Sequence, residues 1–289
     1  MTIGPSSLSE DSYRATPFEQ CGSARNPLPC RVRLSGEGED DEAVFAAIIY
    51  VLVSGCAWRA LPPCFGASKS TVHRRFVVWS RAGVWGRLHQ RILQLLDGQD
   101  VTDLSRAVLD SAHIRAKKGG ELAGPSPVDR GRPGSKMHVL SDANGLPLRV
   151  GLSAANTHDS QALKPMLSHF HMGHESHATE SKPRRLHADK AYDVPHLRRW
   201  LWGKHIGVRI ARKGIDSSER LGRRRWVIDR TMSWLTGYHR LNHRYERKPG
   251  NYLAFLGLAA ALCCYKRLLK LTMQDAVLAS PFQLRLLGD

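Results

Sequence analysis

The sequence lacks the features that exported, membrane-spanning and zinc-binding proteins require. Its N-terminus, MTIGPSSLSEDSYRATPFE, has no apolar core of an export signal. The longest apolar run, YLAFLGLAAALCCY, is about 14 residues long and is flanked by charge, which predicts a buried helix and no membrane span. The six cysteines form no C-x-x-C pair and no zinc-ligand spacing. Cys263 and Cys264 are expected to be small buried side chains in a reducing cytoplasm.

Acids are the scarcer charged residues, with 26 Asp or Glu against 43 Lys or Arg and a formal net charge of +17. The excess is concentrated, because residues 181–250 hold 19 Lys or Arg and 6 Asp or Glu, whereas residues 1–42 hold 8 acids and 4 arginines. Such a field favours a polyanionic partner, of which DNA and RNA are the commonest. The alternatives are a basic face that only contacts solvent, a ribosome-like protein and a protein that binds a membrane surface.

The first part of the chain divides into a leader and a helical unit. Residues 1–40 are rich in Ser, Pro, Gly and acids, which predicts a loosely ordered leader. The segment DEAVFAAIIYVLVSG has acids in its first turn and a terminal glycine, as helices do. Helical spacing also predicts helices in VWGRLHQRILQLL and in ASKSTVHRRFVVW. Ser68 or Ser70 can cap the helix in ASKSTVHRRFVVW. Residues 41–100 are therefore expected to form a small all-helical domain.

From residue 101 the pattern changes to strands interleaved with helices. AVLDSAHIRA alternates as a strand does, GGELAGPSPVDRGRPGSK predicts a loop, and KMHVLSDANGLPLRVGLSAA predicts a hairpin. The segments LHAD and GVRIARKG predict further strands. DSQALKPMLSHF, VPHLRRWLWGKH and the longer RRRWVIDRTMSWLTGYHRL predict helices. The fold class is therefore α/β with a mixed sheet over residues 101–272, followed by a C-terminal tail, 273–289.

Three acids stand out by position. Asp110 lies within the first apolar strand, Asp189 ends a later strand, and Asp229 lies on the last basic helix. An acid in an apolar strand is costly to bury unless it is paired or binds a metal ion. Two such acids and a third on a helix can hold two divalent cations, which suit in-line phosphoryl displacement. The alternative is that each Asp pairs with a neighbouring Arg, His or Lys.

These segments together resemble a known family. VLDSAHIRA, GRPGSKMHVLSDANGLPL, SAANTHDS, LHADKAYD and RRRWVIDRTMSWLTGYHRLNHRYER are similar to the catalytic domain of bacterial insertion-sequence transposases of the DDE type. GCAWRALPPCFG with STVHRRFVVW resembles their N-terminal helical domain. The resemblance implies a ribonuclease H-like fold, with Asp110, Asp189 and Asp229 as the catalytic and metal-binding acids. It also implies Mg²⁺ or Mn²⁺, expected as two ions, and cleavage and rejoining of transposon-end DNA.

The third acidic position departs from that family pattern, which usually has Glu where this chain has Asp229. The missing methylene withdraws the carboxylate by roughly 1.5 Å, and a displacement of about 1 Å can lower a catalysed rate on the order of 100-fold. Many relatives also show a Tyr-x2-Arg-x3-Glu-x6-Lys pattern. Here only Arg225 matches, since Gly222 and Thr236 occupy the Tyr and Lys positions. Arg225 shares a helix face with Asp229 and could bind a DNA phosphate or form an internal ion pair.

Further basic residues are candidates for contacts with double-stranded DNA. The segment ASKSTVHRRFVVW could be the second helix of a helix-turn-helix, or a packing helix with a solvated basic back. It would present Lys69, Thr71, His73, Arg74 and Arg75 to a groove. Phosphate contacts are expected from the later basic cluster, Arg223, Arg224, Arg225, Arg240, Arg244 and Arg247. Trp200, Trp226 and Trp234 are expected in the core, with base stacking as the alternative.

In the implied reaction, water attacks the phosphodiester at the element's end and frees a 3′-OH, which then attacks target DNA. His113, His158 and Asp159 lie in family-like motifs and could orient groups, or be structural. Two other hypotheses remain: a DNA-binding copy or repressor with an impaired metal site, and a ribonuclease H-like nuclease that cuts without joining. The expected setting is the bacterial cytoplasm and nucleoid, with a homodimer assembled on DNA and no membrane partner.

Overall fold

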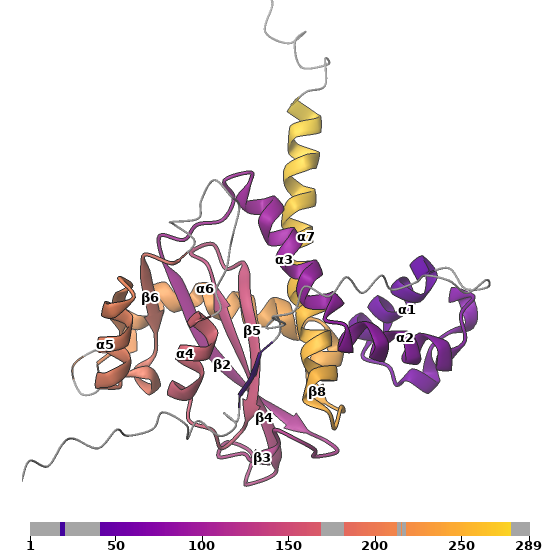
Figure 1. Cartoon of the computed structure of the whole chain (residues 1–289), viewed down its shortest axis with the longest axis horizontal. Helices are drawn as coiled ribbons and strands as arrows, with labels where there is room; N and C mark the ends of the chain where they lie inside the picture. Colours follow the sequence, from indigo (N-terminus) through magenta and orange to yellow (C-terminus); the bar gives the residue numbers. More distant parts are fainter. Residues whose placement is uncertain (1–17, 21–40, 169–181, 213–214, 216–217, 279–289) are drawn as a thin grey trace, which may run out of the picture.

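The computed structural model describes residues 18–20, 41–168, 182–212, 215 and 218–278 (Figure 1). Most of the predicted leader, the His-rich segment HFHMGHESH, Cys21, Cys30 and the last part of the C-terminal tail lie outside these residues.

The N-terminal helical unit contains the helices that the sequence predicts. Its elements are α1 (Asp41–Ser54), the 3₁₀ turns η1 (Trp58–Ala60) and η2 (Pro63–Phe65), α2 (Lys69–Arg81) and α3 (Val84–Asp97). Ser68 caps α2, and its hydroxyl accepts a hydrogen bond from the backbone N–H of Thr71 at 3.1 Å. The linker between α1 and α2 contains two 3₁₀ turns and is much longer than the 3–4-residue turn typical of a helix-turn-helix.

The rest of the described chain forms a mixed sheet with helices on both faces. The strands are β1 (Phe18–Gln20), β2 (Ala107–Ala116), β3 (Gly124–Pro125), β4 (Pro133–Ser141), β5 (Pro147–Ala154), β6 (Arg185–Ala188), β7 (Gly207–Ile210) and β8 (His243–Arg244). The helical elements are α4 (Ser160–Ser168), η4 (Lys190–Tyr192), α5 (Pro195–Gly203), α6 (Ser218–Thr236), η5 (His239–Leu241) and α7 (Pro249–Leu278).

The main strand order is β1-β5-β4-β2-β6-β7, with β3 beside β4 and β8 beside β2. The first strands pair antiparallel, whereas β6 and β7 continue the sheet in parallel, as βα units do. The predicted hairpin is confirmed, because β4 and β5 are joined through the turn that contains Asn144 and Gly145. The predicted Gly/Pro loop contains the short strand β3. Helix α6 begins at Ser218, ahead of the predicted start, and ends at Thr236, before the predicted end at Leu241, where the separate turn η5 lies.

Alternation along β2 assigns the two faces of the sheet to different cores. Leu109 and its partner Leu140 pack with α4 and α5, whereas Val108 and Ile114 pack with α6, α7 and the N-terminal helices. Figure 1 shows α4 and α5 on one side of β2 and β6, with α6 crossing behind the sheet. The core that contains Val108 and Ile114 runs without interruption from α1 and α2 into the sheet, so the N-terminal helices are packed on the sheet.

The last helix is the central apolar element of the fold. Within α7, Pro249–Met273 is long and apolar enough to cross a membrane by length and composition, but 61% of its most apolar window is buried inside the protein. It packs against α3, β5 and α6, and its fully buried residues include Tyr252, Phe255 and Leu256. Core helices of globular proteins satisfy the same criterion of length and composition. The predicted buried helix is therefore confirmed, although it is longer than the apolar run.

Candidate functional site

Two of the three candidate acids lie at the same level of two neighbouring parallel strands. Val108 on β2 is paired with His187 on β6. Two residues further along each chain come Asp110 and Asp189, so the side-chain alternation places both carboxylates on the face covered by α6 and α7. Both residues are partly exposed, which leaves them accessible from solvent.

Backbone N–H groups orient both carboxylates. Oδ1 of Asp110 accepts a hydrogen bond from the N–H of Ser111 at 2.8 Å. Asp189 is the N-cap of η4, and its Oδ1 accepts from the N–H of Ala191 at 2.9 Å. These bonds limit the rotation of each carboxylate.

Tyr192 shows that these two acids share one neighbourhood. Its side chain is almost fully buried, and burial raises the pKa of its hydroxyl well above the usual value. The negative charges of Asp159, Asp110 and Asp189 raise that pKa further, in this order. The phenol therefore stays neutral at physiological pH, beside three carboxylates that come from separate parts of the chain.

Asp229 lies on the solvent-exposed side of α6. Val227 lies two residues before Asp229 and Thr231 two residues after it, and both face the β4–β5 hairpin. There the Thr231 hydroxyl donates to the carbonyl of Gly145 at 2.7 Å. At about 100° per residue, Asp229 is turned about 200° from both, away from the hairpin. Its neighbour Ile228 is buried in the core.

A divalent cation needs several oxygen ligands around one point. Among the side chains that the structure describes, no three His, Cys, Asp or Glu residues are close enough together to hold a metal ion. The chemistry of Asp110 and Asp189 fits such an ion, since both are oriented, partly exposed carboxylates on one face. Asp229 remains the predicted third acid, and its side chain is exposed on α6.

A partly buried polar cluster lies on the opposite face of β2. Asp159, which precedes α4, accepts from the hydroxyl of Ser111 at 2.8 Å and from Nζ of Lys136 at 3.0 Å. Burial alone would raise the pKa of Asp159, but hydrogen bonds from Lys136 and Ser111 hold it below the usual value. Lys136 also donates to the carbonyl of Thr157 at 2.8 Å. Asp159 thus has a partly buried, ion-paired position on the opposite face of β2 from the candidate acids.

The other histidines and polar residues near this cluster have less specific roles. Burial and the nearby charge of Lys136 lower the pKa of His113. His158 is exposed and forms a local hydrogen bond with Ser160. The sequence had not singled out Ser111, Lys136 or Tyr192. The available signals were the position of Ser111 beside Asp110, a lysine inside an apolar strand, and the tyrosine of the motif LHADKAYD.

The predicted DNA-contacting residues of α2 have different environments. Lys69 and Arg74 are exposed. The hydroxyl of Thr71 lies 2.9 Å from that of the capping residue Ser68, and Arg75 forms an ion pair with Asp41 at 3.7 Å. Lys69 and Arg74 are therefore the residues of this helix that are best placed for a phosphate.

Arg240 and Arg244, two of the predicted phosphate contacts, are buried and donate their hydrogen bonds to protein groups. Arg244 is completely buried, and its guanidinium donates to Ser135 Oγ and to the carbonyls of Glu121, Glu246 and Arg247. Arg244 thus fastens β8 to the loop after β2.

Arg240 is only 6% exposed and donates to Glu246 Oε1 at 2.6 Å and to the carbonyl of Cys56 at 2.9 Å. It therefore connects η5 to the N-terminal helices. Arg247 is exposed, and the side chains of Arg223, Arg224 and Arg225 lie outside the described part of the structure.

The tryptophans of α6 are exposed, contrary to the expectation that they belong to the core. Trp226 is 52% exposed and Trp234 is 39% exposed. Their rings enclose the guanidinium of Arg230, whose central carbon lies 4.6 Å and 4.9 Å from the two ring centroids. Trp200 is partly buried and packs against the core beneath α4 and α5, as predicted.

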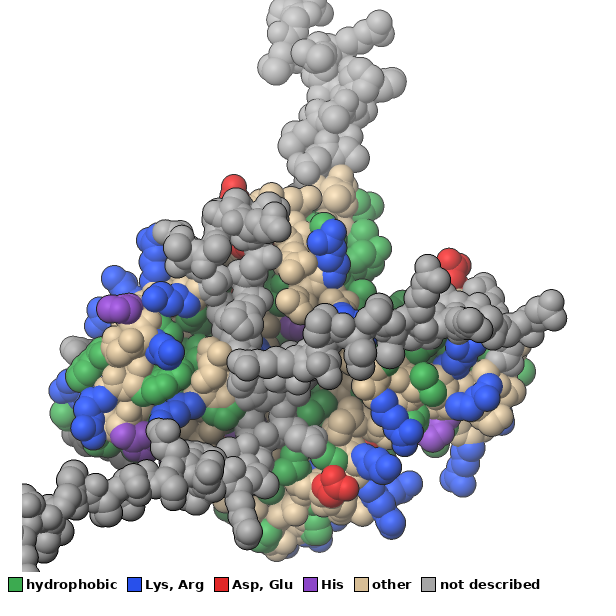
Figure 2. Space-filling view, viewed as in Figure 1, with side chains coloured by type: hydrophobic (Ala, Val, Ile, Leu, Met, Phe, Trp, Pro, Cys, Tyr) green, Lys and Arg blue, Asp and Glu red, His purple; other side chains and the backbone are tan. Residues whose placement is uncertain are grey.

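Positive charge is also visible on the surface. On the face shown in Figure 2, Lys and Arg side chains gather over the α5 side of the sheet and over the N-terminal helices, with few Asp or Glu side chains among them. This distribution is consistent with a polyanionic partner.

Comparisons with known proteins place similar sequences among transposases. Residues 102–264 match a family described as a transposase DDE domain, and residues 26–89 match a family of IS4/5 transposases. A Burkholderia cepacia protein named as a transposase for insertion sequence element IS402 is 37% identical over 58% of this chain and 78% of its own length. A second IS402 protein of the same organism, an uncharacterized 16.2 kDa protein, is 41% identical over 35% of this chain and 70% of its own length. A Brucella ovis protein named as a transposase for element IS6501 is 28% identical over 44% of this chain and 95% of its own length.

Proposed function

Because this chain belongs to the DDE transposase family of insertion sequences and has its ribonuclease H-like fold, we propose that it cuts DNA at the ends of a mobile element and joins the freed 3′-OH to target DNA. The family implies nuclease or transferase chemistry, DNA as a partner and dependence on a divalent metal. The observation that supports the proposal best is the placement of Asp110 and Asp189 at one level of β2 and β6.

In the proposed site, Asp110, Asp189 and Asp229 would hold Mg²⁺ or Mn²⁺, most simply as two ions. When bound, the metal would activate the attacking oxygen and stabilise the departing one. The backbone N–H groups of Ser111 and Ala191 hold the first two carboxylates in place. Positioning of this kind accounts for much of the rate in phosphoryl transfer, since the protein supplies no covalent nucleophile.

The groups behind the acids keep the charge balance of the site. Lys136 neutralises Asp159, so that the carboxylate behind β2 does not add an unpaired negative charge. Tyr192 remains protonated and contributes no charge of its own. We therefore assign Lys136 and Tyr192 as positioning residues and keep the catalytic role for the three acids.

The basic residues outside the site would bind the DNA backbone. Lys69 and Arg74 on α2 and Arg247 after β8 are exposed cations, and such contacts give affinity without reading sequence. In this proposal the helical unit, residues 41–100, is the DNA-binding domain and residues 101–272 are the catalytic domain. We further propose that the working unit is a homodimer assembled on DNA in the bacterial nucleoid.

A second candidate function is a DNA-binding copy, or repressor of its own element, with an impaired metal site. The position of Asp229 favours it, because the side chain is one methylene shorter than the usual Glu and belongs to no three-residue metal cluster in the described structure. Such a protein would bind element DNA without cutting it. A nuclease that cuts without joining is the third candidate.

Cleavage and strand-transfer assays separate these functions. The natural protein, Asp110→Asn and Asp189→Asn are incubated with element-end DNA in Mg²⁺, in Mn²⁺ and in EDTA. The proposal expects metal-dependent cleavage and joining by the natural protein, and only background levels from either Asn variant, with DNA binding retained. Binding without cleavage in any metal would support the repressor, and cleavage without joining would support the nuclease.

A further inference from the structure

A pocket lies where the N-terminal helices meet the end of the sheet. Its volume is about 520 Å³, and its lining includes Gly55, Trp58, Arg59, Lys118, Arg240 and Tyr245. These residues come from the segment after α1, the loop after β2, and the segment around η5 and β8. The volume lies within the range of small-ligand pockets and suits a molecule of the size of a nucleotide.

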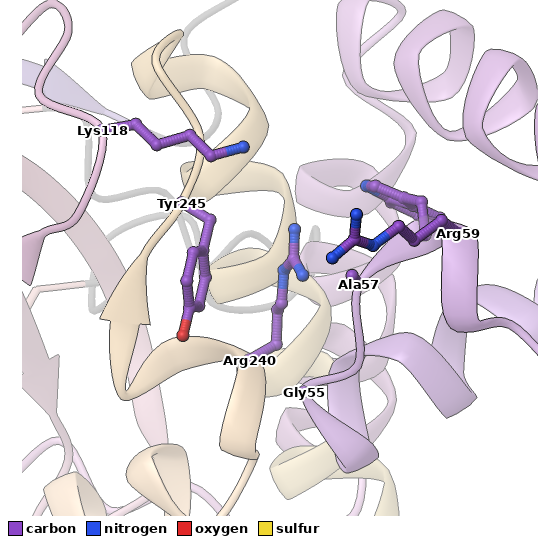
Figure 3. Close-up of a pocket in the computed structure, with 7 residues that line it drawn as sticks. Gly55, Ala57, Arg59, Lys118, Arg240 and Tyr245 are labelled. Carbon is purple, nitrogen blue, oxygen red and sulfur yellow. The ribbon is translucent and has the colours of Figure 1, made fainter.

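The pocket concentrates positive charge. Figure 3 shows the charged ends of Lys118, Arg59 and Arg240 directed toward one another across the pocket. Glu246 neutralises Arg240 through an ion pair of 2.6 Å. Arg59 and Lys118 are exposed, and neither forms an ion pair with any residue in the described part of the chain. Two cations facing one space without a carboxylate favour an anionic ligand.

The pocket also presents planar groups. The guanidinium carbon of Arg240 lies 5.3 Å from the ring centroid of Tyr245 and 6.0 Å from that of Trp58. Tyr245 is 36% exposed, and the ion pair with Glu246 and a bond to Cys56 hold Arg240 in place. Bases of single-stranded nucleic acids stack on aromatic rings and on guanidinium planes.

The backbone of the pocket is closely packed. Gly55 has a positive φ of +70°, and an added Cβ would lie 2.9 Å from Cβ of His239. Gly120, in the loop that follows Lys118, has φ +104°, and an added Cβ would collide with the carbonyl oxygen of Arg247. The three segments are thus fixed against one another before any ligand binds, which reduces the entropy lost on binding.

We infer that this pocket binds one nucleotide of a single DNA strand, with the base against Tyr245 and Arg240 and a phosphate between Arg59 and Lys118. The inference rests on the proposed function, since DNA supplies the nucleotide. From Asp110 to Ala116, at the end of β2, the strand rises about 20 Å. One DNA strand covers that distance in about six nucleotides, so a strand held at the acids can reach the pocket.

The test uses the full-length protein in EDTA and a fluorescein-labelled single-stranded 12-mer, with the blunt duplex of the same sequence for comparison. We expect Tyr245→Ala to weaken single-strand binding by about 10-fold, and Tyr245→Phe to retain it. Arg59→Ala and Lys118→Ala should each weaken binding and lower the slope of log affinity against log salt by about 0.7. Binding of the duplex should change by less than about 3-fold, since a stacked base has no free face.

The matched controls are Tyr265→Ala, an exposed tyrosine on α7, and Lys204→Ala, an exposed lysine after α5. Both should bind like the natural protein. The inference is overturned if the Tyr245 and cation variants bind the single strand as tightly as the natural protein, or if the controls weaken binding equally. Weakening by the cation variants alone, with Tyr245→Ala unchanged, also overturns it, because the pocket would then bind a bare phosphate.

The metal-dependent cleavage assay on the same preparations separates this inference from the proposed function. If the protein cleaves DNA but the pocket variants bind the single strand as tightly as the natural protein does, only the pocket inference is refuted. Pocket-dependent binding by a protein that cleaves nothing in any metal would refute the proposed chemistry and support the pocket.

Discussion

Asp110 on β2 and Asp189 at the end of β6 each lie two residues beyond the strand pair Val108–His187, and the charges of both raise the pKa of the buried Tyr192 hydroxyl. The sheet fixes this pair, because neither acid can move without its strand or the turn that follows. The third acid lies on a helix, whose distance from the sheet is set by side-chain packing. In the proposed site, the position of α6 and the length of the side chain at position 229 therefore decide whether the third carboxylate reaches the other two.

Asp229→Glu should raise the rate of metal-dependent DNA cleavage by about 10- to 100-fold, because it restores a methylene toward the other two acids. Asp229 is exposed, so the free energy of unfolding should change by less than about 0.5 kcal/mol. Single-turnover cleavage in Mg²⁺ and in Mn²⁺ measures the effect. Equal rates for both proteins would show that side-chain length at position 229 does not limit the reaction.

Arg244→Ala should lower the free energy of unfolding by about 3 kcal/mol, since it leaves buried carbonyls and the hydroxyl of Ser135 without their donor. Urea unfolding followed by tryptophan fluorescence measures this loss. Arg247→Ala is the matched control on an exposed neighbour, and it should leave stability unchanged while weakening DNA binding. An unfolding midpoint for Arg244→Ala equal to that of Arg247→Ala would contradict the structural role.

Arg74→Ala should weaken binding of duplex DNA about 3- to 10-fold and reduce the salt slope by about 1, as loss of one phosphate contact does. Arg81→Ala, an exposed arginine at the opposite end of α2, is the control and should have a smaller effect. Fluorescence anisotropy at several salt concentrations measures both. If the two variants weaken binding equally, α2 contributes general charge and no defined contact.

Acid should destabilise the fold between pH 6.5 and 4, partly through His89. Burial lowers the pKa of His89 to about 4, although a hydrogen bond with the carbonyl of Pro147 opposes the shift. In this window the unfolded chain binds a proton that the folded chain does not, so stability is full above pH 6.5 and falls as the pH falls, by up to about 1.4 kcal/mol per pH unit.

Burial lowers the pKa of His138 to about 4 as well and adds to this effect, whereas burial raises the pKa of Asp142 to about 6 and opposes it. His89→Gln should therefore flatten the dependence of unfolding free energy on pH, as measured by urea unfolding at pH 7, 6 and 5. His196→Gln, on the exposed face of α5, should leave that dependence unchanged. An unaltered slope for His89→Gln would exclude His89 as a source of the acid sensitivity.

Local patterns predicted most of the fold. Alternation in AVLDSAHIRA gave β2, the turn DANG gave the β4–β5 hairpin, and helical spacing gave α2, α3 and α6. These patterns depend on neighbours that are two to four residues apart, which a sequence displays directly. The same patterns placed Asp110 in a strand and Asp189 at a strand end.

Burial of individual charged and aromatic side chains could not be predicted in the same way. Arg240 and Arg244 lie in a basic segment like Arg247, yet only Arg247 is exposed. The guanidinium of buried Arg244 is surrounded by Ser135, the distant carbonyl of Glu121 and two carbonyls of its own segment. Exposed Trp226 stacks on Arg230. A sequence gives the residue types but not the partners that folding supplies.

The sequence by itself determined the α/β class, the order of strands and helices and the basic character. It also placed the three aspartates, the last of which is shorter than the Glu usual in the family. Only the tertiary structure decided that Asp110 and Asp189 are level, that Asp229 faces solvent, and that Arg59, Lys118 and Arg240 line one pocket. The reason is physical: periodicity is a property of a single segment, whereas strand register and the meeting of distant loops depend on packing between segments.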